Sequence, residues 1–155
     1  MAKAKAGSKA KTKTQPKSKA RFKAKASPVA PPSREVAGVS RTVDRYAAGL
    51  YNGDVPSLKK AFRPEAIVSG WMGDESFVKP VQFLYDFINE SDSPARRGDP
   101  FRCGVLGIEI AGNTATVQLA EQAYLDFDYR TCLQLMKMKG SWWIVSKLFN
   151  GTEMN

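Results

Sequence analysis

The sequence predicts an α+β domain, in which helices pack on one face of a strongly curved antiparallel sheet. Three observations indicate this class. Apolar residues recur at helical spacing in the first part of the domain, whereas from residue 101 onward they alternate with polar residues as in strands. Helices that precede a run of strands are typical of α+β domains. Fifteen of the sixteen aromatic residues follow residue 34, so this part should contain the hydrophobic core.

Two helices open the domain. Apolar residues at helical spacing predict a first helix from about residue 34 to 51, and the Asn-Gly pair that follows is expected to end it. Asp54 predicts the cap of a short second helix, because its carboxylate can accept a backbone hydrogen bond from the first turn. Pro56 is compatible with that turn. The Arg-Pro pair at 63–64 should end this helix, because proline cannot continue one.

A hairpin and a third helix come next. The sequence predicts a strand over residues 67–72 and a short returning strand over 76–79, separated by a Gly-Asp turn. A third helix is expected to start at Pro80, since the apolar residues that follow it have helical spacing. The loop over residues 91–100 should end this segment.

The second half of the domain is expected to form an antiparallel meander. Its strands are predicted over residues 101–111, 114–124, 128–138 and 142–149. Short turns rich in Gly, Asn, Lys and Ser separate most of them, and residues 125–127 are expected to form a corner. Three helices and this sheet complete the predicted domain.

The net charge of +9 is divided unevenly along the chain. Residues 1–34 hold nine lysines, two arginines and no acidic residue, which gives this segment a charge of +11 and leaves −2 for residues 35–155. A segment of Lys, Ala, Ser, Thr and Pro cannot bury enough apolar surface to offset the entropy of ordering it. We therefore expect residues 1–34 to be a disordered basic tail and residues 35–155 to be the folded domain.

The tail is patterned for contact with phosphates. Its first 25 residues carry basic side chains only at odd positions, and in an extended chain this spacing places them on one side, about 6–7 Å apart. They are Lys3, Lys5, Lys9, Lys11, Lys13, Lys17, Lys19, Arg21, Lys23 and Lys25. Because lysine predominates, we expect salt-sensitive binding to DNA or RNA without sequence specificity. A tail that only adds solubility and an organelle transit peptide remain as alternatives. Membrane attachment is not expected, since Phe22 is the tail's only aromatic residue.

The composition excludes several kinds of site. Without histidine the chain has no imidazole base and no histidine ligand for a metal. Cys103 and Cys132 are too few for a four-thiolate metal site, so neither a metal nor another cofactor is predicted. The absence of an apolar signal segment or a long apolar run predicts an intracellular protein, in the cytoplasm, nucleoid or nucleus, with organelle import as the alternative.

Two stretches resemble a known superfamily. The segment Asp54–Trp71, DVPSLKKAFRPEAIVSGW, resembles the opening of nuclear transport factor 2-like domains, in which an Asp-capped helix leads through Phe-x-Pro-x-Ala into the first strand. Residues 128–137 and 140–149 are similar to the last hairpin of the subgroup named putative lumazine-binding, which has polyketide-cyclase-like relatives. The resemblance implies a cone of three helices and a bent sheet around a pocket, commonly dimeric through the sheet.

The relatives include ketosteroid isomerases, scytalone dehydratase, polyketide cyclases and non-catalytic association domains. Several of these enzymes use an Asp–His pair or a tyrosine with carboxylic acids. This chain has no histidine for the first arrangement, so acid–base chemistry would fall to carboxylates and tyrosines. The available set is Asp126, Asp128, Glu109, Glu121, Tyr46, Tyr51, Tyr124 and Tyr129. Among them Asp126, Asp128 and Tyr129 are the catalytic candidates, because they lie around the predicted corner.

Alternation along the strand that starts at residue 128 assigns the pocket residues. Asp128 and Arg130 share a strand face that mixes polar and soft apolar groups, as a surface that binds ligand would, although the reverse assignment of the two faces stays open. The two residues also have the spacing of a structural ion pair. Trp71 and Tyr46 are the other predicted pocket residues, with a role as core aromatics as the alternative.

Two functions remain open at this point. The first is a binding or association domain with a pocket for a small apolar or aromatic molecule, attached to nucleic acid or an RNA-rich assembly by its tail. The second is a cofactor-free isomerase, dehydratase or cyclase that uses a carboxylate and a tyrosine. A carboxylate or phenol that faces the pocket would favour the enzyme, and a wholly apolar pocket would exclude it.

Overall fold

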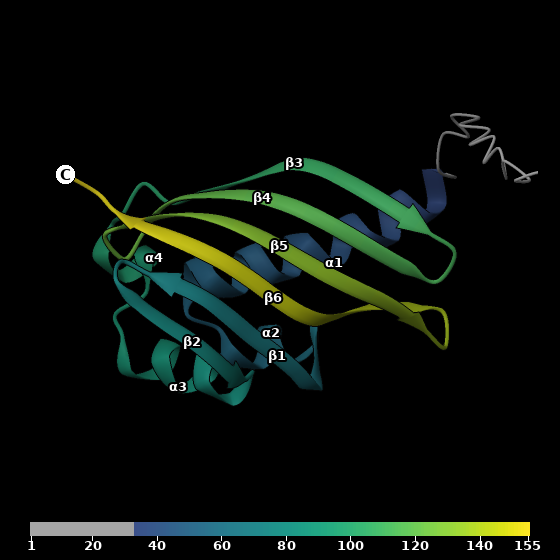
Figure 1. Cartoon of the computed structure of the whole chain (residues 1–155), viewed down its shortest axis with the longest axis horizontal. Helices are drawn as coiled ribbons and strands as arrows, with labels where there is room; N and C mark the ends of the chain where they lie inside the picture. Colours follow the sequence, from purple (N-terminus) through teal and green to yellow (C-terminus); the bar gives the residue numbers. More distant parts are fainter. Residues whose placement is uncertain (1–32) are drawn as a thin grey trace, which may run out of the picture.

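A long helix, α1 (Ser33–Asn52), lies along one face of a six-stranded sheet (Figure 1). The computed structural model describes residues 33–155, so the predictions made for residues 1–32 lie outside the part described. The remaining elements are α2 (Val55–Lys59), β1 (Phe62–Met72), β2 (Glu75–Pro80), α3 (Gln82–Glu90), α4 (Pro94–Arg97), β3 (Arg102–Ala111), β4 (Thr114–Tyr124), β5 (Phe127–Met138) and β6 (Ser141–Glu153). The predicted α+β class is confirmed. We call the helix-covered face of the sheet its inner face and the opposite one its outer face.

The strands form one sheet in the order β2-β1-β6-β5-β4-β3. The predicted hairpin of β1 and β2 and the antiparallel meander from β3 to β6 are both present. One pairing departs from the prediction, because β1 and β6 run parallel. No tight turn joins these two strands, since α3 and α4 connect the hairpin to the meander. Their relative direction is therefore not set by a hairpin, and the sheet is mixed.

The short helices α2 and α4 follow their local sequence signals. Asp54 caps α2 as predicted, and its carboxylate accepts hydrogen bonds from the backbone N–H of Ser57 at 3.1 Å and from its hydroxyl at 2.6 Å. A fourth helix, α4, lies in the segment predicted as a loop, where Ser93 caps it and Gly98 ends it with a φ of 76°. No helix within residues 33–155 has the length and apolar character needed to cross a membrane.

The first strand begins five residues earlier than predicted. β1 starts at Phe62, so the Arg-Pro pair at 63–64 lies inside the strand and not at the end of a helix. The pairing register between β1 and β6 shifts between Phe62 and Ile67. Proline is tolerated at such irregularities because it cannot donate a ladder hydrogen bond. The prediction that this pair ends the second helix is therefore wrong: α2 ends at Lys59, and Pro64 lies in the irregular first part of β1.

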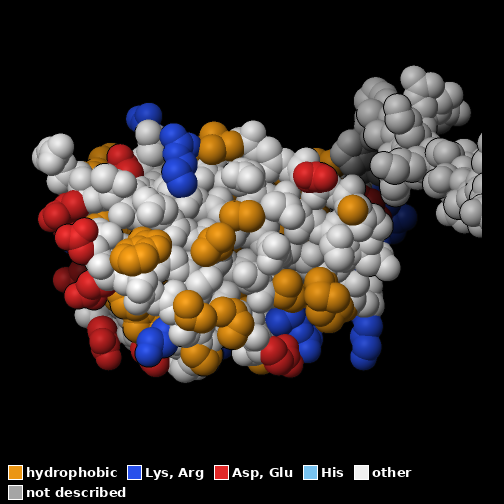
Figure 2. All heavy atoms as spheres, viewed as in Figure 1, with side chains coloured by type: hydrophobic (Ala, Val, Ile, Leu, Met, Phe, Trp, Pro, Cys, Tyr) orange, Lys and Arg blue, Asp and Glu red, His pale blue; other side chains and the backbone are white. Residues whose placement is uncertain are grey.

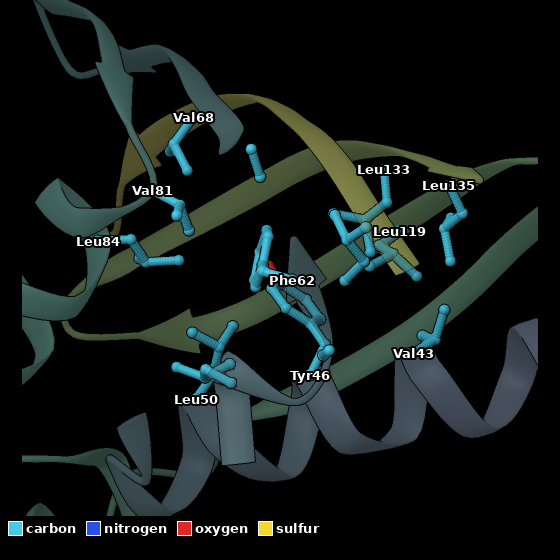
Figure 3. Close-up of a cluster of buried hydrophobic side chains, with 14 of the residues drawn as sticks. Val43, Tyr46, Leu50, Phe62, Val68, Val81, Leu84, Leu119, Leu133 and Leu135 are labelled. Atoms are coloured by element: carbon cyan, nitrogen blue, oxygen red, sulfur yellow. The ribbon is translucent and has the colours of Figure 1, made fainter. Parts of the chain in front are cut away.

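The core lies between α1 and the inner face of the sheet. One stripe of α1, at the spacing that predicted the helix, is at most 2 % exposed and comprises Val39, Val43, Tyr46 and Leu50. Figure 3 shows Val43, Tyr46 and Leu50 directed at Phe62 and at leucines from β4 and β5. Each buried apolar side chain of this size contributes about 1.5–3 kcal/mol relative to an exposed one. This packing fixes the axis of α1 across the sheet.

The first turn of α1 is fastened to the hairpin of β5 and β6. The Nζ of Lys137 donates to Glu35 Oε1 at 2.6 Å, and the indole N–H of Trp142 donates to Glu35 Oε2 at 3.1 Å. The hydrogen bond from Lys137 holds the pKa of the Glu35 carboxyl below its usual value. About two turns further on, the Thr42 hydroxyl donates to the carbonyl of Trp142 at 3.0 Å. The first half of α1 is thus held by the β5–β6 hairpin.

Two glycines allow strands to approach closely beside the inner face. Gly70 in β1 has a φ of 153°, and a Cβ there would lie 2.0 Å from the carbonyl oxygen of Phe149. Gly151 in β6 pairs with Tyr129 in β5, and a Cβ at this glycine would lie 2.4 Å from the tyrosine ring. A side chain at either position would force the neighbouring strand to shift. These glycines therefore allow the rings of Tyr129 and Phe149 to pack against the sheet.

Candidate functional site

A cavity of about 60 Å³ lies between the inner face of the sheet and the helices, beside the last turn of α1. Most of its wall is apolar and comes from α1, β1, β2, α3 and β6. The half-buried rings of Phe77, Phe83 and Phe87 belong to β2 and α3, so the cavity lies nearest to the surface on that side. Polar atoms enter the wall only from Glu121, Lys147 and the phenols Tyr124 and Tyr129. A cavity of this size holds a few water molecules or one small ligand group.

Four polar side chains form a buried cluster at the inner end of this cavity, and we call them the polar cluster: Tyr46, Glu121, Thr131 and Lys147. The Lys147 ammonium donates to the hydroxyl oxygen of Tyr46 and lies 3.3 Å from Glu121 Oε2. The Tyr46 hydroxyl donates in turn to Glu121 Oε1, and the Thr131 hydroxyl donates to Oε2 at 2.7 Å. Glu121 and Lys147 are 2 % and 6 % exposed. Every member therefore has a partner, as buried polar groups require.

The cluster brings three distant segments together. Tyr46 comes from α1, Glu121 and Thr131 from the paired strands β4 and β5, and Lys147 from β6. The Lys147 ammonium also lies 5.0 Å from the centre of the Tyr46 ring and 5.4 Å from that of Phe149. Aromatic faces attract cations, so both rings add to the stabilisation of this buried charge.

The phenols of the site stay protonated at neutral pH. Burial raises the pKa of Tyr46 well above its usual value, and the charge and hydrogen bond of Glu121 raise it further. Burial raises the pKa of Tyr124 and Tyr129 too, with Glu121 as the next cause for both. These tyrosines can act as neutral hydrogen-bond donors. The groups that carry charge in the cavity wall are the Glu121 carboxylate and the Lys147 ammonium.

A bulge in β4 brings Glu121 and Tyr124 to the same face. Residues three apart in a regular strand point to opposite faces, yet both side chains are buried and line the cavity. The pairing register between β4 and β5 shifts between these two residues, and Ala123 within the shift has a φ of 54°. The Asp128 carboxylate accepts a hydrogen bond from the backbone N–H of Ala123 at 2.8 Å. Asp128 thus holds the bulge from the other strand.

The residues that the sequence predicted as site candidates lie in three places: the buried interior, an exposed turn and the exposed side of the sheet. Tyr46 belongs to the polar cluster, and Tyr129 lines the cavity. Asp126 is exposed in the turn before β5, where Arg97 Nη2 lies 2.6 Å from its carboxylate. Asp128 is exposed as well, and its predicted ion pair with Arg130 is not among the salt bridges of the described residues.

Trp71 and Arg130 lie on the outer face. Trp71 is 52 % exposed, and both residues line a shallow groove of about 330 Å³ beside Leu148, away from the cone's interior. The cavity is instead lined from the strand face that carries Tyr129, which is the assignment the sequence analysis left open. Side-chain alternation alone separates the two faces of a strand but does not say which one points inward.

Sequence reasoning missed Lys147 and gave Glu121 no special role. A signal for Glu121 exists, since it continues the alternation of Val117 and Leu119 and so places a carboxylate on a buried strand face. No comparable signal exists for Lys147, because the register between β5 and β6 shifts between Gln134 and Leu135. Among residues 33–155, no three His, Cys, Asp or Glu side chains are grouped as they would be to hold a metal ion.

The geometry defines what chemistry the cavity could support. A carboxylate and an ammonium lie side by side at the inner end of a mostly apolar space. A ligand that fills the space would exclude water and strengthen their electrostatic effect on it. The carboxylate is a base within reach of a bound molecule, and the ammonium is a donor for a developing negative charge on oxygen.

Comparison with known proteins gives three kinds of match: a family model, a curated relative and solved structures. A family model described as putative lumazine-binding matches residues 34–150. A curated relative, Aldolase FrzH from a Cladobotryum species, is 27 % identical over 119 residues, which cover 76 % of this chain and 92 % of that protein.

Solved structures match the fold. A nuclear transport factor 2-like protein of unknown function from Shewanella baltica OS155 has a TM-score of 0.71 at 23 % identity, over 78 % of this chain and 96 % of that one. A second such protein of unknown function, from Methylobacillus flagellatus KT, has a TM-score of 0.72 at 22 % identity, over 78 % and 94 % of the two chains. At this level of identity the similarity concerns the fold alone.

Proposed function

Because the chain belongs to the putative lumazine-binding family of nuclear transport factor 2-like proteins, we propose that its cavity binds a small, largely apolar carbonyl compound and performs acid–base chemistry on it. The observation that carries this proposal is the charged pair of Glu121 and Lys147 in the wall of an otherwise apolar cavity. From the sequence, a binding domain and an enzyme are both open. A carboxylate and two phenols in the cavity wall are the feature that favours the enzyme.

In this proposal Glu121 removes a proton from the carbon next to the ligand's carbonyl group. The Lys147 ammonium stabilises the negative charge that develops on the carbonyl oxygen. Tyr46 touches both groups and holds them in place, while the aromatic walls exclude water. Proton removal beside a carbonyl is the first step of aldol additions and one way to isomerise ketones. The match to a protein named as an aldolase supports this class of chemistry.

The test is proton exchange at a carbon beside a carbonyl group. The full-length protein would be incubated in D₂O with a panel of ketones of increasing size, from acetone to phenylacetone, and loss of the proton signal would be followed by NMR. We expect faster exchange than in buffer, and a loss of about 10²–10⁴-fold in Glu121→Gln. Glu109→Gln is the matched control, since Glu109 is an exposed glutamate of β3 outside the cavity. Exchange no faster than in buffer, or an equal loss in both variants, would exclude the proposal.

For the tail we propose attachment to nucleic acid, supported by the +11 charge of residues 1–34 beside a domain of charge −2. If six to ten of its basic residues contact phosphates, binding to duplex DNA or RNA should weaken about 10³–10⁵-fold between 50 and 200 mM salt. Fluorescence anisotropy with unrelated duplexes would measure this. The control replaces the ten basic residues of the first 25 by glutamine. Equal binding by that variant, or by a chain that begins at Ser33, would contradict the proposal.

We also propose that two copies of the chain associate through their outer faces. Six large apolar residues are exposed there on β1, β2, β3, β5 and β6: Ile67, Trp71, Val78, Leu106, Met136 and Leu148. Figure 2 shows hydrophobic side chains spread across this side of the domain. Six strands of ten residues span about 900–1,000 Å², and a stable interface needs about 800 Å² per partner. The face is therefore large enough for a self-complementary contact.

A further inference from the structure

Among residues 33–155, Lys147 is the one buried lysine. Of the other lysines in this part, Lys137 is half-buried, and those at 59, 60, 79 and 139 are exposed. Lys147 also lines the cavity, so a bound molecule could reach its amine. The lysine ammonium is strongly hydrated and sits on a flexible side chain. Burying it is therefore costly unless an opposite charge and hydrogen-bond partners compensate for the lost water. Unlike an arginine or a hydroxyl, a lysine amine can form a Schiff base with a carbonyl compound.

We propose that Lys147 forms an imine with the carbonyl carbon of the ligand, so that the chemistry of the cavity passes through a covalent intermediate. This inference rests on the proposed function, because it takes the ligand to be an aldehyde or ketone. It adds a second role to Lys147, which becomes the nucleophile and no longer only a donor to the carbonyl oxygen.

The polar cluster can supply the neutral amine that this reaction needs. The Lys147 ammonium donates to the Tyr46 oxygen, and the Tyr46 hydroxyl donates to Glu121, so a proton can pass from lysine to tyrosine while the tyrosine proton passes to the carboxylate. A direct route also exists across the 3.3 Å between Lys147 Nζ and Glu121 Oε2. An apolar ligand in the cavity favours this transfer, because the neutral pair costs less to desolvate than the charged pair.

The step balances without an oxidant or reductant. The amine nitrogen attacks the carbonyl carbon, an N–C bond forms, and the π electrons of the C=O bond move to oxygen, which takes the proton held by Glu121. The C–OH bond of this carbinolamine then breaks and water leaves, with its second hydrogen supplied from the nitrogen through the cluster. The product is a protonated imine, in which the positive nitrogen withdraws electrons from the neighbouring carbon. Glu121, again a carboxylate, can remove the proton from that carbon, and hydrolysis by water returns the free lysine.

Reductive trapping of the full-length protein tests the imine. The protein would be treated with a low concentration of acetaldehyde and sodium cyanoborohydride, digested, and its lysines examined for an ethyl group by mass spectrometry. Exposed lysines are the internal control, since labelling by access alone would favour Lys59, Lys60, Lys79 and Lys139 over a buried residue. We expect Lys147 to be labelled at least tenfold more than any of these. Labelling of Lys147 at or below the level of the exposed lysines would overturn the inference.

A charge-preserving variant separates the two roles of Lys147. Lys147→Arg keeps a cation beside Glu121 but cannot form an imine, so ketone proton exchange should fall to the level of Glu121→Gln if the imine is required. Circular dichroism would verify that the variant is folded, and the trapping result on the unmodified protein stands without it. If trapping fails while exchange still depends on Glu121, the imine is wrong and the proposed function stands. If ketone exchange is also no faster than in buffer, both the imine and the proposed function are contradicted.

Discussion

Replacing Glu121 with leucine is expected to lower the free energy of unfolding by about 3–5 kcal/mol, because it leaves the Lys147 ammonium buried without its counter-charge. Adding Lys147→Met should recover more than half of this loss, since a buried ion pair can often be replaced by apolar side chains of similar volume. The remaining deficit would come from two buried hydroxyls: that of Tyr46, which loses both partners, and that of Thr131, which loses its acceptor on Glu121. Each would cost about 1–3 kcal/mol. Adding Tyr46→Phe to the Glu121→Leu/Lys147→Met variant should remove the tyrosine's share of this deficit.

Urea unfolding followed by tryptophan fluorescence measures these differences, since all three tryptophans lie in the described domain. Glu109→Leu is the control for loss of a surface carboxylate and should stay within about 0.5 kcal/mol of the unmodified protein. The double variant is also informative about function, because it should be folded yet inactive in ketone exchange. A Glu121→Leu protein as stable as the original would mean that the cluster does not hold a desolvated charge pair.

The second large effect is expected at the outer face. Leu148 is 55 % exposed and lies at the centre of the sheet on β6, so in the proposed dimer it meets the partner copy. Leu148→Asp would place two unpaired carboxylates in that contact, which should weaken association by about 10²-fold or more. The domain itself should remain folded, because in a single copy the side chain faces solvent.

Analytical ultracentrifugation at tens of micromolar protein would read out the change. The unmodified full-length chain should sediment with twice the mass of one chain, and Leu148→Asp with the mass of one. Met154→Asp is the control, since Met154 is an exposed apolar residue beyond the end of β6. A single-chain mass for the unmodified protein, or an unchanged dimer in Leu148→Asp, would contradict the proposed interface.

Local signals predicted most elements of this fold. The helical spacing of α1 identified the stripe that is buried, and the Gly-Asp and Gly-Asn turns located the hairpins, because these features depend on residues close together in the chain. The parallel pairing of β1 with β6 could not be found in this way. It depends on how the hairpin and the meander meet, and no turn sequence encodes that contact.

The candidate site was harder to predict for the same reason. Lys147 is 26 residues from Glu121 and 101 residues from Tyr46, so the three meet only in the folded domain. Asp128 carried the local pattern of a site residue, yet it holds the bulge that turns Tyr124 inward. Its hydrogen bond to Ala123 is a tertiary detail that alternation cannot reveal. Sequence patterns therefore located the strands that build the site but not the residues that face it.

The anchoring of α1 also has a practical consequence. Its first turn is held at the β5–β6 hairpin by Glu35, while Leu50 in its last turn lines the cavity. Twenty residues of helix separate these ends by about 30 Å. A bead or sensor chip attached directly at Ser33, in a chain that begins there, would thus sit at the opposite end of the domain from the phenylalanines beside the cavity. Immobilisation at this residue should leave the domain oriented for small-molecule capture, whereas coupling through surface lysines would randomise it.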